Sequence, residues 1–170
     1  MSNVIPLLSG EKLKWLGSFD FRNLYFQLHK GMERDGWDIK EKRYVEKSKP
    51  GAENKNVEII WEATLDIDNY TRAKIDIFFD LTDVTEPMTE WEPGITRPIF
   101  KGAIDIVFSY SLITDYNDEW SKHPVLRSFQ KFYENKIYRK TLDGLKGEHW
   151  GYGWGYVNWL KELMQMVAIA

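Results

Sequence analysis

Apolar and polar residues alternate along three segments of the chain, the pattern of a β-strand with one buried face. Two of these segments flank the turn residues Asp68-Asn69-Tyr70 and predict a hairpin. A third runs from Phe100 to Leu112, and the charged segment 37–47 suits an exposed edge strand. The apolar positions of the hairpin are Val57, Ile59, Trp61, Ala63, Leu65 and Ile67, followed by Ala73, Ile75, Ile77, Phe79 and Leu81. The pattern therefore predicts four strands.

The polar side of the hairpin carries charges of both signs. A three-residue loop would fix three cross-strand pairs: Glu62 with Asp76, Glu58 with Asp80, and Asp66 with Arg72. Like charges that face each other raise a pKa or attract a cation when they are buried. A solvated sheet face is the simpler interpretation, because antiparallel sheets commonly leave one face in water.

Before and after the predicted strands in the sequence, apolar residues recur at helical spacing instead. Residues 21–36 predict a first helix that stops at Asp35-Gly36. Toward the C-terminus, Pro124 opens a basic helix over 124–141, and a last helix follows a glycine-containing break at 142–150. The acidic segment 82–98 contains three prolines and predicts a long loop.

We therefore expect one α+β domain over 1–170. Its antiparallel four-stranded sheet would be a meander, with one N-terminal helix and two C-terminal helices packed on one face. Residues 1–18 show neither period clearly and are expected to form an N-terminal arm.

The composition narrows the class of protein. The 170 residues include no cysteine, which excludes disulfides, thiolate metal sites and thiol nucleophiles. A formal net charge of -3 argues against a protein that coats nucleic acid. No segment is apolar enough to span a membrane or to act as a signal peptide, so we expect a cytoplasmic protein. Charge is nevertheless segregated, with acid at 80–92 and 115–119 and base at 40–49 and 127–146.

Histidine is the usual starting point for acid–base chemistry, and the chain has three: His29, His123 and His149. No two of them share a helical metal-binding spacing, and no serine lies in a nucleophile turn. Each is best interpreted as structural or solvated. We therefore predict no catalytic residue, no metal site and no cofactor.

Aromatic residues alternate with glycine from Trp150 to Tyr156. If extended, this segment would present its rings on one side as a platform for a flat ligand. If helical, it would place Gly151 and Gly155 on one face, where another element could approach closely. The helical interpretation is favoured because a helical stripe from Tyr156 to Val167 follows directly.

The C-terminal residues from Leu163 to Ala170 are apolar, whereas a chain end is normally polar and frayed. Docking of this segment on the chain's own sheet is the simplest explanation. Contact with a second subunit is the more specific alternative. The candidate partner-contact residues are Trp91, Met164, Val167 and Ile169.

Three further stretches stand out together. They are Phe21-Arg-Asn-Leu-Tyr-Phe-Gln-Leu-His with Gly36-Trp37, then Phe100-Lys-Gly-Ala-Ile-Asp-Ile, and Trp120-Ser-Lys-His-Pro-Val-Leu running to Lys136-Ile-Tyr-Arg. Over most of its length the chain resembles a group of small uncharacterised archaeal proteins. The group has no known function, so the resemblance implies an order of elements and an archaeal source, but no site.

The leading hypothesis is a non-enzymatic binding or assembly domain that associates with itself or docks on a protein partner. It rests on the apolar C-terminus, the segregated charge and the absence of a catalytic constellation. A weaker hypothesis has the basic helix 124–141 bind RNA or an acidic partner.

The main alternative is a small-ligand-binding protein or enzyme with an apolar aromatic pocket between the sheet and the C-terminal helices. In that case His149 or His29 would be a possible acid or base. The candidate lining residues are Trp61, Phe79, Phe108, His149, Trp150 and Trp154.

Overall fold

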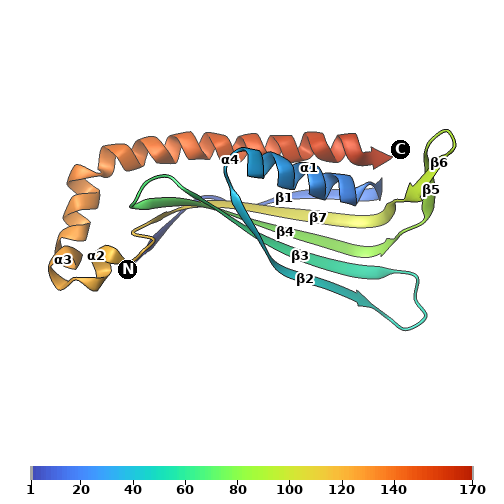
Figure 1. The fold of residues 1–170 in the computed structure, drawn as a ribbon, viewed down its shortest axis with the longest axis horizontal. Helices are drawn as coiled ribbons and strands as arrows, with labels where there is room; N and C mark the ends of the chain where they lie inside the picture. Colours follow the sequence, from blue (N-terminus) through green and yellow to red (C-terminus); the bar gives the residue numbers. More distant parts are fainter. Residues whose placement is uncertain (1, 170) are drawn as a thin grey trace.

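The computed structural model describes residues 2–169 and shows a long, curved antiparallel sheet with helices on one side (Figure 1). The strands are β1 (Asn3–Phe19), β2 (Asp38–Ser48), β3 (Lys55–Asp66), β4 (Thr71–Thr85), β5 (Met88–Glu92), β6 (Ile95–Pro98), β7 (Phe100–Thr114) and β8 (Ala168–Ile169). The helices are α1 (Phe21–Arg34), α2 (Glu119–Lys122), α3 (Pro124–Phe132) and α4 (Arg139–Val167), with the π-helical turn η1 (Tyr133–Ile137) between the last two.

The main sheet has the strand order β2-β3-β4-β7-β1-β8, and all neighbouring strands are antiparallel. This confirms the predicted α+β class and antiparallel sheet, and the four predicted strands are neighbours in the predicted order. The sheet has six strands rather than four, because β1 and the short β8 extend it. The register of the β3–β4 hairpin is as predicted, with Glu58 opposite Asp80 and Glu62 opposite Asp76.

The predicted N-terminal arm over 1–18 is instead a sheet strand. β1 pairs with β7 from Asn3 to Phe19, but its register shifts twice between Pro6 and Glu11. Gly10, at φ 67°, lies within this irregular part. Such bulges place extra residues in one strand and break its alternation. The pattern of β1 was therefore too irregular to predict a strand.

The segment 82–98 was predicted as a loop and also contains strands. β4 continues to Thr85, and β5 and β6 form a separate two-stranded hairpin beyond the end of the sheet (Figure 1). Gly94, at φ 81°, makes the turn of this hairpin possible. Proline is rare inside sheets, so the three prolines of this segment favoured a loop.

The predicted helix break at 142–150 is wrong, because α4 continues from Arg139 to Val167. A glycine costs a helix about 1 kcal/mol relative to alanine, which packing can offset. Leu142 and His149 are buried along this part of α4, Leu142 in a cluster with Tyr70 and Tyr138, and His149 against Tyr110 of β7. The interruption lies earlier, at η1, where the chain turns from α3 into α4 (Figure 1).

Helices α1 and α4 lie side by side over the same face of the sheet, whereas α2 and α3 lie beyond its end (Figure 1). α3 buries none of its residues, so only one of the two C-terminal helices covers the sheet in the predicted way. Contact between α1 and α4 is close at Gly31, where a Cβ atom would stand 2.2 Å from Cη2 of Trp159. Among residues 2–169, none of the helices combines the length and apolar character needed to cross a membrane.

Candidate functional site

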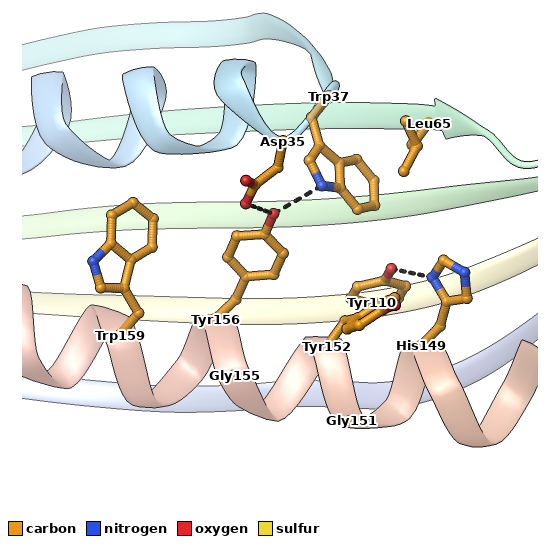
Figure 2. Close-up of a pocket in the computed structure, with 10 residues that line it drawn as sticks. All are labelled: Asp35, Trp37, Leu65, Tyr110, His149, Gly151, Tyr152, Gly155, Tyr156 and Trp159. Atoms are coloured by element: carbon orange, nitrogen blue, oxygen red, sulfur yellow. Dashed lines mark hydrogen bonds between the residues drawn. The ribbon is translucent and has the colours of Figure 1, made fainter.

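A cavity of about 590 Å³ lies between α4, the C-terminal end of α1 and the sheet (Figure 2). This volume falls within the roughly 300–1,000 Å³ typical of small-molecule sites. Most of its wall is aromatic or glycine. The lining residues are Asp35, Trp37, Leu65, Tyr110, His149, Gly151, Tyr152, Gly155, Tyr156 and Trp159.

The end of α1 positions one side of the cavity. Asp35 caps the helix, and Gly36 follows at φ 97°, a conformation that favours glycine. The chain then reverses, and the backbone N–H of Trp37 donates to the carbonyl of Met32 at 3.1 Å. This turn holds Asp35 and the buried Trp37 beside each other at the start of β2.

A chain of hydrogen bonds crosses the cavity from this turn to α4 (Figure 2). Nε1 of Trp37 donates to the hydroxyl of Tyr156 at 3.0 Å, and that hydroxyl donates to Oδ2 of Asp35 at 2.6 Å. Burial, and then the hydrogen bond to Asp35, raise the pKa of Tyr156. The phenol is therefore protonated at neutral pH and fixed in direction.

A second polar pair joins the sheet to α4. The hydroxyl of Tyr110 on β7 lies 2.5 Å from Nδ1 of His149, and both residues are buried. Burial raises the pKa of Tyr110. Burial also lowers the pKa of His149, and the negative charge of Glu148 partly opposes this lowering. Both groups are therefore uncharged at neutral pH, which favours hydrogen bonding over the binding of an ion.

Two exposed glycines of α4, Gly151 and Gly155, are part of the cavity wall. A Cβ atom at Gly151 or Gly155 would meet nothing within 4 Å, and both residues line the cavity. At Gly153, by contrast, a Cβ atom would stand 2.7 Å from Cδ1 of Leu8 and 3.3 Å from Cδ2 of Tyr110. Gly153 therefore permits close packing on the sheet, while Gly151 and Gly155 face open space and bring no other element close.

Of the six predicted pocket residues, only His149 lines this cavity. Trp61 and Phe79 pack against each other in the core, with ring centroids 5.0 Å apart. Phe108 is also buried, and its ring lies against those of Tyr110 and Tyr156. These strand residues belong to the closely packed part of the sheet, where the helices leave no gap.

The two tryptophans of the glycine-aromatic segment point elsewhere. Trp150 is 53% exposed, and Trp154 is half-buried against the core. The side of α4 that faces the cavity instead presents His149, Tyr152, Tyr156 and Trp159, as Figure 2 shows. Helical spacing alone could have grouped these residues, because they recur every three or four positions.

The predicted partner-contact residues Met164 and Val167 are covered by their own chain, at 2% and 0% exposure. They fall on the inner stripe of α4, which packs on the sheet. The side chains of Trp91 and Ile169, the other two candidates, lie outside the part of the chain that the structure describes.

The predicted facing acids, such as Glu58 and Asp80, lie on the open side of the sheet. Burial first, then the charges of Glu58 and Asp105, raise the pKa of Asp80. No group of three or more potential metal ligands occurs among the described residues, however. His29 and His123 are likewise outside the cavity lining.

No protein-family model, curated protein or solved structure matches this chain. The resemblance to archaeal proteins therefore stays a prediction, and any function must come from the site itself.

Proposed function

We propose that this protein binds a small organic ligand in the cavity under α4. The observation that carries the proposal is the cavity itself, whose largely aromatic wall holds two fixed polar pairs, Tyr110 with His149 and Tyr156 with Asp35. A mostly apolar cavity with a few fixed polar groups is the usual form of a small-molecule site.

The lining favours a flat, mostly apolar ligand with a hydrogen-bond acceptor. Trp37, Tyr152 and Trp159 supply aromatic walls. The hydroxyl of Tyr110 and Nδ1 of His149 share a hydrogen bond, and with the phenol as donor the neutral imidazole carries its proton on Nε2. In this tautomer the Nε2–H group can donate to an acceptor atom of the ligand, and Asp35 with Tyr156 offers polar contacts across the cavity.

Binding of N-phenyl-1-naphthylamine, a neutral aromatic dye that fluoresces in apolar sites, tests the proposal. We expect one dye per chain. The double variant Gly151→Leu/Gly155→Leu adds two large side chains where α4 lines the cavity and should weaken binding at least about tenfold.

The matched control is Gly144→Leu/Gly147→Leu. These two glycines also lie in α4 with nothing within 4 Å of a Cβ atom, but they do not line the cavity. This control variant should bind the dye as the wild type does. Equal binding by all three proteins would contradict the proposal, because the dye would then bind elsewhere.

Self-association, docking on a protein partner and RNA binding through 124–141 stay predictions. Burial of Met164 and Val167 removes part of the basis for association through the C-terminus. A measured mass of one chain across micromolar concentrations would count against self-association.

A further inference from the structure

Helix α3 exposes large apolar side chains that the rest of the protein does not cover. Val125, Phe129 and Phe132 are 67%, 57% and 55% exposed, respectively. Their spacing of four and three residues places them on one helical face. Burying such side chains would be favourable by about 1.5–3 kcal/mol each, so this face suits an apolar environment outside the chain.

The opposite face of this helical segment is firmly attached. Glu134 accepts hydrogen bonds from the hydroxyl of Tyr70 at 2.5 Å and from Oγ1 of Thr114 at 3.0 Å. Tyr133 stacks on Trp120 with ring centroids 4.7 Å apart. These contacts anchor α3 and η1 at the end of the sheet (Figure 1) and leave Val125, Phe129 and Phe132 exposed to solvent.

The segment 120–140 is strongly positive, although the whole chain is acidic and Asp115, Asp118, Glu119 and Asp143 adjoin the segment. Residues 120–140 contain six lysines or arginines and one acid, Glu134. The hydrogen bonds of Glu134 turn its carboxylate toward Tyr70 and Thr114. The cations are Lys122, Arg127, Lys131, Lys136, Arg139 and Lys140. An anionic surface would complement this segment.

We infer that α3 and η1 dock on the surface of an anionic lipid bilayer. Val125, Phe129 and Phe132 enter the interfacial region, and the long lysine and arginine side chains reach the lipid phosphates. This surface lies outside the cavity, so the inference does not depend on the proposed ligand.

A second copy of the chain fits this face less well. In a symmetric dimer the same patch meets itself. Pairing α3 with α3 would then bring two sets of cations together, which costs free energy. A bilayer that contains acidic lipids attracts both the apolar side chains and the cations.

Sedimentation with vesicles tests the inference. We expect the full chain to sediment with phosphatidylcholine vesicles that contain phosphatidylglycerol and to stay in solution with phosphatidylcholine alone. Phe129→Ser/Phe132→Ser should weaken partitioning at least about tenfold. Lys131→Gln/Lys136→Gln should weaken it about fivefold for each cation removed.

Phe26→Ser is the matched control, because Phe26 is 53% exposed but lies on α1. It should sediment like the wild type. All these positions are exposed, and an unchanged circular dichroism spectrum checks that each variant folds.

Three results would overturn the inference. One is a wild type that stays in solution with both kinds of vesicle, and another is equal sedimentation with both. The third is a wild-type dimer, measured by light scattering, that Phe129→Ser/Phe132→Ser converts to a monomer, which would assign this face to a second copy.

Discussion

Helices α3 and α4 are both rich in aromatic residues and are separated only by η1 and one further residue, yet they differ in burial. α4 runs along the sheet and buries a stripe that includes Leu160 and Met164, while α3 buries no residue. The difference follows from what lies beneath each helix, because α3 extends beyond the end of the sheet (Figure 1). Apolar content alone therefore does not tell which helix packs on its own protein and which stays exposed.

The largest expected effect tests this difference directly. Leu160 is 2% exposed on α4, and Leu160→Ala should lower the free energy of unfolding by about 2–5 kcal/mol because it leaves a cavity. Phe129→Ala on α3 removes a larger side chain but should change the free energy of unfolding by no more than about 0.5 kcal/mol. Urea denaturation measures both. A loss at Phe129 comparable to that at Leu160 would show that α3 packs on its own chain.

A smaller effect tests how closely α4 is held against α1. Gly31→Ala would drive a Cβ atom into Trp159, so it should cost about 1–3 kcal/mol despite the better helix propensity of alanine. Gly144→Ala is the control on α4, where the Cβ atom meets nothing within 4 Å, and it should stabilise by about 0.5–1 kcal/mol. Thermal unfolding shows whether each variant is more or less stable than the wild type. Stabilisation by Gly31→Ala would mean that the two helices are farther apart than described.

The smallest effect concerns only the pH dependence of stability. Burial lowers the pKa of His149 in the folded protein, while the unfolded chain keeps the ordinary value of 6.5. As the pH falls below 6.5 toward the lowered pKa, the unfolded state binds a proton that the folded state resists, so stability is lost. His149→Gln cannot titrate and should lose less stability over this range. Urea denaturation at several pH values measures the stability of both proteins. If the wild type and His149→Gln lost the same stability over this range, His149 would not be the cause of the loss.

Much of the sheet could be predicted because strand alternation is a local property. The pairing of Glu62 with Asp76 followed from the hairpin pattern alone. β1 was missed because bulges interrupt its alternation near Gly10. The continuity of α4 was missed because glycine propensity was weighed without the packing that a sheet supplies.

The candidate site was harder to predict because four distant segments build it. Tyr110 occupies a regular apolar position of β7, so its hydroxyl gave no separate signal. Asp35 was interpreted only as part of a helix stop. Both become site residues because α4 lies across the sheet at a particular place, and no local pattern specifies where a helix crosses a sheet.

The pairing of β1 with β7 has a consequence for the order of folding. Asn3 pairs with Thr114, so the ribosome must add about a hundred residues between the two partners. At roughly 5–20 residues per second, β1 waits several seconds without its neighbour. The β2–β3–β4 hairpins need only nearby residues and can form during that interval. β1 is therefore expected to join the sheet late, and until then its edge is available to chaperones.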